Sequence, residues 1–192
     1  IIKIAKKLNN NNFHFPSLIS FDTLNQVDYI KNNPHNIGFV THLIEDLNKI
    51  DMFKKNILKK EKKININKEN FSEIKVMLSP TVCHHLYSMI SNSKLKKNLI
   101  ATAQGHCFRY ESKNMNFLER LWNFTMREII FIGSEKHVLN GLSLTMKLIE
   151  EVLDEFGLIY MIQSASDPFF GEKAGEKSLF QKAFKLKYEV RS

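Results

Sequence analysis

Apolar residues recur every three or four positions in two stretches of the first half of the chain. These stretches are residues 17–31 and 38–53. Such spacing places apolar side chains on one face of a helix. The pattern therefore predicts a helix in each stretch, and a third helix is predicted over residues 81–91.

The strongest helical signal lies in the second half of the chain. Ser134 is a favourable N-cap residue, and apolar positions recur from Val138 to Phe156. Gly157 follows directly, and glycine is a common residue at the point where a helix stops. We therefore expect one long amphipathic helix between Ser134 and Gly157.

Short runs rich in Ile, Val and Phe alternate with these helices and predict strands. The predicted strands cover residues 74–78, 101–111, 126–132, 158–163 and 184–190. We therefore expect a mixed fold, and no internal repeat or clear domain boundary divides the chain. Because the last predicted strand runs almost to Ser192, we expect a following strand to be missing from this piece of sequence.

The composition is that of a folded domain with a sizeable core. Of the 192 residues, 43% are hydrophobic and 15 are Phe, which excludes a disordered chain. Two cysteines cannot build a disulfide-dense scaffold, so we expect a reducing compartment, the cytoplasm. No apolar run reaches the roughly 18 residues that a membrane-spanning helix needs, so we expect no membrane partner.

The formal net charge is +8, and nearly all of the basic residues are Lys. A solvated Lys-rich surface explains most of this charge, and an acidic partner, either nucleic acid or protein, is the sharper interpretation. Residues 54–70 are rich in Lys and predict an exposed edge segment or insertion. Three of the four Arg lie between positions 109 and 127. Because Arg makes forked contacts with phosphates, we single out that stretch.

Residues 106–128 carry the most informative combination of side chains. Arg109 and Glu111 are two positions apart, so they share one face of a strand. Arg120 and Phe124 follow on the returning limb of a predicted hairpin. Arg can bind phosphate, a carboxylate can accept hydrogen bonds from an amino group, and a Phe ring can stack on a planar base. This set could hold a nucleoside triphosphate, although a surface hairpin with ordinary charge pairs would also contain it.

The hairpin resembles motif 2 of class II aminoacyl-tRNA synthetases, in particular of their seryl branch. Further blocks, in the same order, resemble amino acid:[carrier protein] ligases, which are similar to the catalytic domain of an atypical, zinc-dependent seryl-tRNA synthetase. The blocks are LSPTVC (78–83), GHCFRYE (105–111), MREIIFIGS (126–134) and DPFFG (167–171). The resemblance implies an α+β fold in which an antiparallel sheet is flanked by helices. It also implies one catalytic domain over residues 1–192 that is incomplete at its C-terminal end.

The resemblance assigns a role to each residue of the hairpin. In the family, the first Arg of motif 2 binds the α-phosphate of ATP, and the acid two positions later contacts the adenine amino group. A later Arg serves the γ-phosphate, and an aromatic ring stacks on adenine. The matching residues are Arg109, Glu111, Arg120 and Phe124. Arg109 is therefore the expected catalytic residue, and Mg²⁺ is expected with ATP.

The resemblance also implies a zinc ion. In the family, a Cys before motif 2, an acid on its second strand and a third ligand farther downstream hold the metal. The first two match Cys83 and Glu128, whereas the third ligand and motif 3 are expected beyond Ser192. Three protein ligands leave an open position on Zn²⁺, here for the substrate amino group. A buried Cys83 that binds no metal is the alternative interpretation.

Other side chains near these positions are given no part in the chemistry. Cys107 shares a strand face with Arg109 and is interpreted as a packing residue. The adjacent His84 and His85 diverge on a helix, so they are not expected to bind one metal ion together. The block DPFFG (167–171) could either line the pocket or serve packing alone, and both interpretations stay open.

The implied function is ATP-dependent activation of a small amino acid, followed by transfer to the phosphopantetheine thiol of a carrier protein. One alternative is a fragment of a tRNA-charging, seryl-type synthetase. The other is a non-catalytic or degraded paralogue that binds nucleotide alone. The sequence shows no long coiled coil that could bind tRNA, and this favours a carrier protein over tRNA as the partner. The resemblance further implies a homodimer through motif 1, near Phe13–Ser20.

Overall fold

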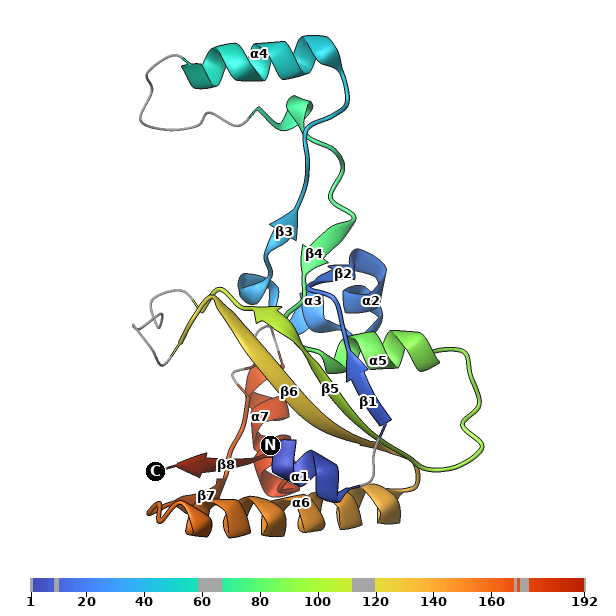
Figure 1. The fold of residues 1–192 in the computed structure, drawn as a ribbon, viewed down its shortest axis with the longest axis vertical. Helices are drawn as coiled ribbons and strands as arrows, with labels where there is room; N and C mark the ends of the chain where they lie inside the picture. The colour runs from blue at the N-terminus through green and yellow to red at the C-terminus, as the bar shows by residue number, and fades with distance from the viewer. Residues whose placement is uncertain are drawn as a thin grey trace.

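The computed structural model describes residues 2–8, 11–58, 67–111, 120–167, 169 and 173–191. Figure 1 shows the arrangement of the elements. In chain order these are α1 (Ile2–Lys7), β1 (Asn11–His14), β2 (Leu18–Ser20), α2 (Phe21–Gln26), α3 (Tyr29–Asn32), η1 (Pro34–Asn36), β3 (Phe39–Val40), α4 (Leu47–Leu58), η2 (Lys68–Asn70), β4 (Val76–Leu78), α5 (Cys83–Ile90), β5 (Leu99–Phe108), β6 (Asn123–Ile132), α6 (Glu135–Glu155), β7 (Met161–Ser164), α7 (Ala174–Ala183) and β8 (Tyr188–Arg191). Among the described residues, no helix combines the length and apolar character that a membrane crossing requires.

The main sheet has the order β1-β5-β6. β5 and β6 form a long antiparallel ladder that runs from the pair Leu99–Ile132 to the pair Phe108–Asn123. β1 lies parallel to β5 on the other side, with Asn11 opposite Ala101. Antiparallel pairing dominates this sheet, as expected. The strands predicted over 101–111 and 126–132 are confirmed as β5 and β6, although both begin and end at different residues from those predicted, except that β6 also ends at Ile132.

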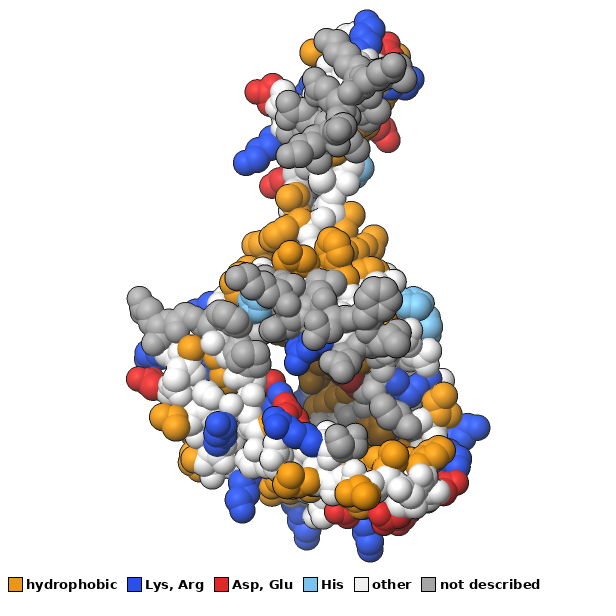
Figure 2. Space-filling model, turned by 90° about the vertical axis from the view of Figure 1, so that its left-hand side faces the viewer, with side chains coloured by type: hydrophobic (Ala, Val, Ile, Leu, Met, Phe, Trp, Pro, Cys, Tyr) orange, Lys and Arg blue, Asp and Glu red, His pale blue; other side chains and the backbone are white. Residues whose placement is uncertain are grey.

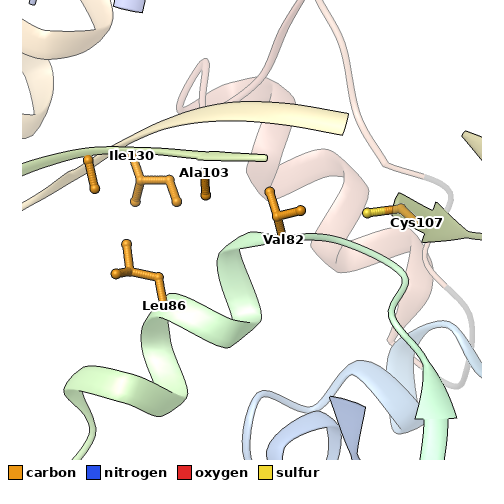
Figure 3. Packing of buried hydrophobic residues seen from close by; sticks show 6 residues of the cluster. Val82, Leu86, Ala103, Cys107 and Ile130 are labelled. Atoms are coloured by element: carbon orange, nitrogen blue, oxygen red, sulfur yellow. The ribbon is translucent and has the colours of Figure 1, made fainter. Parts of the chain in front are cut away.

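One face of this sheet packs on α5. Figure 3 shows Val82 and Leu86 pointing toward Ala103 and Ile130 of the sheet. The strand side chains buried at this contact are small ones, namely Ala101, Ala103 and Cys107. Small side chains let a helix approach a sheet closely, so Leu86 fills the space above them.

The opposite face packs on α1 and α6. Side chains along β6 alternate between the two faces, as the pleat of a strand requires. Ile130 joins the cluster under α5, whereas Ile129 and Phe131 pack against the cluster that contains Leu148 of α6. The sheet therefore lies between helices, which confirms the expected α+β class. Figure 1 shows α5 on one side of the sheet and α6 on the other.

The long helix predicted after Ser134 is confirmed. The Ser134 hydroxyl accepts a hydrogen bond from the His137 backbone N–H at 3.4 Å, as an N-cap does. The helix ends before Gly157, which has a φ of 64°. A positive φ favours glycine, so the stop predicted from the sequence has this physical cause.

Gly141 of α6 sits directly against the ring of Phe131. An added Cβ at this position would lie 2.4 Å from Phe131 Cδ1, far inside van der Waals contact. We therefore expect Gly141→Ala to lower the free energy of unfolding by about 1–3 kcal/mol through overpacking. Urea unfolding of the purified protein measures this change.

Gly175→Ala in α7 is the matched control, because an added Cβ there meets no atom within 4 Å. Alanine is the better helix former, so this variant should be neutral or more stable by up to about 1 kcal/mol. Equal effects of the two substitutions would contradict the close packing of α6 on the sheet.

A second sheet has the order β2-β4-β3 and is antiparallel throughout. From it the chain continues into residues 41–72, which we call the α4 arm. Its base is a pair of extended segments, in which Ser72 N–H donates to His42 O at 2.8 Å and Ile44 N–H donates to Asn70 O at 2.9 Å. Figure 1 shows that the arm carries α4 away from the main sheet.

Hydrophobic side chains gather at the base of the α4 arm, as Figure 2 shows. Leu18, Phe39 and Val76 of the second sheet are among the exposed large hydrophobic residues. Phe53 of α4 packs on Phe71, which belongs to the extended base of the arm, and their ring centroids lie 5.9 Å apart. The arm thus has a small apolar contact of its own.

Two of the predicted helices are partly wrong. Residues 17–31 begin as strand β2 and then form two short helices, α2 and α3, instead of one. Residues 38–53 begin as β3, and α4 starts only at Leu47. In both cases the first residues pair with β4, and strand pairing overrides the helical spacing of the apolar positions.

The other predicted elements are reproduced with shorter lengths. α5 falls within the predicted helix 81–91, and β4, β7 and β8 fall within or close to their predicted ranges. α1, β1 and α7 were not predicted. Of the Lys-rich segment 54–70, residues 54–58 belong to α4 and 68–70 form η2, whereas 59–66 lie outside the described residues. Its role as an edge segment or insertion stays a prediction.

Candidate nucleotide and metal site

Arg109 lies just beyond the end of β5 and is held from several directions. Its backbone N–H donates to Trp122 O at 3.0 Å, and its Nε donates to Pro80 O at 2.9 Å. Its guanidinium carbon lies 5.6 Å from the centroid of the Phe124 ring. Within the described part of the chain, no carboxylate forms an ion pair with Arg109. Its charge is therefore available to an anionic ligand.

Phe124 is brought to Arg109 by the register of the ladder. Phe124 lies opposite Cys107 in the β5–β6 pairing, and Arg109 follows two positions after Cys107 on the same side of the strand. The contact between a guanidinium and an aromatic face is favourable and orients both groups. Two of the four residues predicted to contact ATP therefore touch one another.

Glu111 and Arg120, the other two predicted ATP contacts, form an ion pair with each other. The Arg120 side chain is 55% exposed and the Glu111 side chain 27%. Residues 112–119, which connect them, lie outside the described residues. An ion pair this exposed contributes only about 0–1 kcal/mol, so a charged ligand could replace it at little cost.

Cys83 and Glu128, the two predicted zinc ligands, are brought together by Thr81. The Thr81 hydroxyl donates to Glu128 Oε1 at 2.6 Å and lies 3.3 Å from Cys83 Sγ. Burial raises the pKa of the Cys83 thiol to about 12, and the negative charge of Glu128 adds to this shift. The sequence analysis did not single out Thr81, which is buried between the two.

These groups have the chemistry of a zinc site but supply two protein ligands. Thiolate sulfur and carboxylate oxygen are both common ligands of Zn²⁺. No group of three or more His, Cys, Asp or Glu side chains suited to a metal is found among the residues that the structure describes. The donor set therefore fits part of a zinc site, and a complete site needs at least one more ligand.

His84, next to Cys83 in the chain, packs between two tyrosine rings. The His84 ring lies with its centroid 5.3 Å from that of Tyr29 and 6.2 Å from that of Tyr87. Burial lowers the pKa of His84 to about 4, and the positive charges of His85 and Arg109 contribute. His84 is therefore neutral near pH 7. Cys107 is fully buried in the core, in agreement with its interpretation as a packing residue.

Asp167, in the C-terminal part of the chain, is held by two side chains. Lys187 Nζ donates to its Oδ1 at 2.7 Å, and Gln181 Nε2 donates to its Oδ2 at 2.8 Å. Burial acts to raise the pKa of Asp167, but these two hydrogen bonds and the charges of Lys187 and Arg109 outweigh it and lower the pKa. Asp167, the first residue of the DPFFG block, is thus fixed to Gln181 of α7. It also lies within electrostatic range of Arg109.

Comparison with known proteins places the chain in a family. The model of the tRNA synthetase class II core domain (G, H, P, S and T) matches residues 52–189. Amino acid–[acyl-carrier-protein] ligase 2 of Bradyrhizobium diazoefficiens is 26% identical, over 99% of this chain and 56% of its own length. Ligase 1 of the same organism is 29% identical, over 92% of this chain and 53% of its length.

A type-2 serine–tRNA ligase of Methanothermobacter thermautotrophicus is 22% identical, over 93% of this chain and 36% of its own length. The chain thus spans about half the length of the carrier-protein ligases and about a third of the serine–tRNA ligase.

Solved structures share the fold. The seryl-tRNA synthetase of M. kandleri, in a crystal structure with A. aeolicus tRNASec, matches 85% of this chain and 32% of its own, with a TM-score of 0.74 at 20% identity. The prolyl-tRNA synthetase of Giardia lamblia with prolyl-adenylate matches 80% of this chain and 27% of its own, with a TM-score of 0.57 at 20% identity. This chain therefore belongs to the class II tRNA synthetase core domain family.

Proposed function

We propose that the full-length protein activates a small amino acid with ATP and transfers it to the phosphopantetheine thiol of a carrier protein. The observation that carries this proposal is the Arg109 guanidinium, which Pro80 O and the Phe124 ring hold in place and which forms no ion pair with a carboxylate of the described residues. Similarity to two proteins named amino acid–[acyl-carrier-protein] ligases supports the carrier-protein part. Residues 1–192 then form part of one catalytic domain.

In the proposed reaction, a carboxylate oxygen of the amino acid attacks the α-phosphorus of ATP. The bond from this phosphorus to the bridging oxygen breaks, and pyrophosphate leaves; Mg²⁺ would neutralise part of its charge. Arg109 neutralises the charge that builds up on the α-phosphate oxygens, and its position is fixed in advance by Pro80 O and Trp122 O. The carrier thiol then attacks the carbonyl of the adenylate, and AMP leaves.

Binding of ATP separates the ion pair between Glu111 and Arg120 in this proposal. Glu111 accepts hydrogen bonds from the adenine amino group, and Arg120 turns to the γ-phosphate. Phe124 offers its ring to the adenine. The low cost of breaking an exposed ion pair makes this exchange of partners feasible.

Cys83 and Glu128 would hold a zinc ion in the proposed full-length enzyme, together with a third ligand from another part of the protein. When bound, the metal would supply a binding position for the amino group of the substrate. Thr81 orients the Glu128 carboxylate through its 2.6 Å hydrogen bond, as groups behind metal ligands commonly do.

The experiment that tests the proposal measures ATP–pyrophosphate exchange by the full-length protein with glycine, alanine and serine. Exchange with at least one of these amino acids, followed by loading of a phosphopantetheinylated carrier protein, is the expected result. Charging of tRNA instead of the carrier would favour the second candidate, which the similarity to serine–tRNA ligases supports. Tight ATP binding without exchange would favour a non-catalytic paralogue.

Three further properties belong to the same proposal. The active form is a homodimer that associates near Phe13–Ser20. Its partners are a small amino acid and a carrier protein, and it works in the cytoplasm. Size-exclusion chromatography with light scattering tests the first of these.

A further inference from the structure

The short connection between β4 and α5 touches both halves of the proposed site. Its Pro80 carbonyl accepts the hydrogen bond from Arg109 Nε at 2.9 Å. Its Thr81 hydroxyl donates to Glu128 Oε1 at 2.6 Å and lies 3.3 Å from Cys83 Sγ. One connection therefore contacts both the residue proposed to bind the α-phosphate and the two proposed zinc ligands. Whatever fixes this connection fixes both halves together.

Ser79 is the first residue of this connection, and all of its polar groups are hydrogen-bonded. Its N–H donates to Ser17 O at 2.8 Å, and its carbonyl oxygen accepts from Phe108 N–H at 2.9 Å. Its hydroxyl donates to Thr81 O at 2.9 Å and lies 3.1 Å from His85 Nε2. The residue is only 1% exposed. Segments that are distant in the sequence therefore meet at Ser79.

The hydrogen bonds of the Ser79 hydroxyl determine which group donates to which. A serine hydroxyl has one proton, and a carbonyl oxygen can only accept. The Ser79 proton therefore points to Thr81 O, and the hydroxyl oxygen is left to accept from His85 Nε2. His85 thus carries a proton on Nε2. Its N–H keeps the Ser79 hydroxyl in the orientation that reaches Thr81 O.

The His85 ring is itself fixed by aromatic packing. It stacks on Phe15, with the ring centroids 5.3 Å apart and the planes at 17°. Phe15 in turn stacks on Phe13 of β1, with the centroids 5.7 Å apart. The Phe15 N–H donates to Gln104 O of β5 at 2.9 Å. The imidazole is therefore held against the main sheet while its Nε2 meets Ser79.

We propose that Ser79 and His85 are positioning residues for the reaction. They fix the connection between β4 and α5, so that the Pro80 carbonyl and the Thr81 hydroxyl keep the site residues in the geometry that the reaction requires. This inference rests on the proposed function for its kinetic part. Neither Ser79 nor His85 is assigned contact with the substrate or with a metal.

Ser79→Ala tests the inference because it removes the hydroxyl and both of its hydrogen bonds. A small displacement of a positioned group can cost up to about 10²-fold in rate. We expect kcat for ATP–pyrophosphate exchange by the full-length protein to fall by about 10-fold or more, with the KM for ATP changed less than about 3-fold. Zinc affinity should fall by about 10-fold in the same variant, because Thr81 is displaced as well.

His85→Phe is the second variant, and it keeps the inference testable if Ser79→Ala does not fold. It retains a ring that can stack on Phe15 and removes the Nε2 donor. It should show part of the loss in kcat that Ser79→Ala shows. The double variant should lose little more than Ser79→Ala alone, because His85 acts through the Ser79 hydroxyl. Fully additive losses would contradict this order of support.

Gly141→Ala is the matched control for loss of stability. It is expected to weaken the packing of α6, which lies on the opposite face of the main sheet from α5. Thermal unfolding of both variants shows whether they lose stability to a similar extent, and only Ser79→Ala should lose kcat. If Ser79→Ala lowers Tm and leaves the kcat of the folded protein unchanged, Ser79 is merely structural and the inference is overturned.

A second measurement does not depend on catalysis. The Nε–H of Arg109 donates to Pro80 O, and its exchange with water can be followed by NMR on ¹⁵N-labelled protein. Its signal is the one that disappears in Arg109→Lys. In Ser79→Ala this exchange should become about 2–10-fold faster, the factor that one hydrogen bond contributes. Gly141→Ala should leave it unchanged.

The two measurements separate the inference from the proposed function. Faster Arg109 Nε–H exchange in Ser79→Ala, combined with a wild-type protein that shows no ATP–pyrophosphate exchange, would support the positioning role and refute the proposed function. Unchanged Arg109 Nε–H exchange in Ser79→Ala would overturn the inference, whatever the activity of the wild-type protein.

Discussion

Arg109→Ala is expected to lower kcat/KM for ATP–pyrophosphate exchange by the full-length protein by about 10²–10³-fold, as loss of one preorganised donor to a developing negative charge typically does. The guanidinium is held by Pro80 O and by the Phe124 ring before any ligand arrives. Its charge is therefore aligned without reorganisation at the moment of reaction. Exchange rates measured at saturating and subsaturating ATP separate kcat from KM.

Two further arginine variants make this test specific. Arg109→Lys keeps the charge but loses the forked geometry, and it should recover only part of the rate. Arg127→Ala is the control for loss of a positive charge, because Arg127 contacts Asn12 and Thr102 instead of the Arg109 region. A loss in Arg127→Ala as large as that in Arg109→Ala would show that the effect is a general one of basic charge.

Cys83→Ala should remove the zinc that we propose for the full-length protein. Cys83 and Glu128 are the two proposed ligands, and loss of either leaves too few donors for tight binding. After dialysis, the metal content should fall from about one zinc per chain to nearly none. Thr81→Val removes the hydrogen bond to Glu128 and should weaken zinc affinity by about 10–100-fold. Elemental analysis and competition with a chelator measure these changes.

Cys107→Ala is the matched control for zinc. Cys107 is fully buried among the core residues under α5, so its loss should affect stability and leave metal content unchanged. Equal zinc content in the Cys83→Ala and Cys107→Ala proteins would refute the proposed ligand set. Loss of zinc from both would point to an unfolded domain, which circular dichroism would reveal.

Elements governed by local signals were predictable from the sequence. The Ser134 cap and the Gly157 stop bracket α6 because both act within one turn of the helix end. Residues 17–31 and 38–53 were predicted incorrectly at their starts because β2 and β3 exist through pairing with β4, which is distant in sequence. In α7 the apolar Leu179 and Phe180 are both exposed, so no buried apolar face marks this helix and its periodic signal is weak.

The site residues also divide into those whose proximity was predictable from local sequence and those whose proximity depends on the whole fold. The proximity of Arg109 and Phe124 follows from a hairpin register and was foreseeable. The proximity of Cys83 and Glu128 could be expected only from a family resemblance, since the fold alone joins α5 to β6. Thr81 was not singled out, because an isolated polar residue does not reveal which distant segment it will meet.

The parallel pairing of β1 with β5 has a consequence for synthesis of the chain on the ribosome. β1 emerges early, but its partner follows much later, since Asn11 pairs with Ala101. At about 5–20 residues per second, β1 waits for several seconds with its backbone groups unpaired. β5 and β6, in contrast, can close their ladder soon after both emerge. We expect the nascent chain to need protection of β1, which limited proteolysis of stalled ribosome complexes would detect.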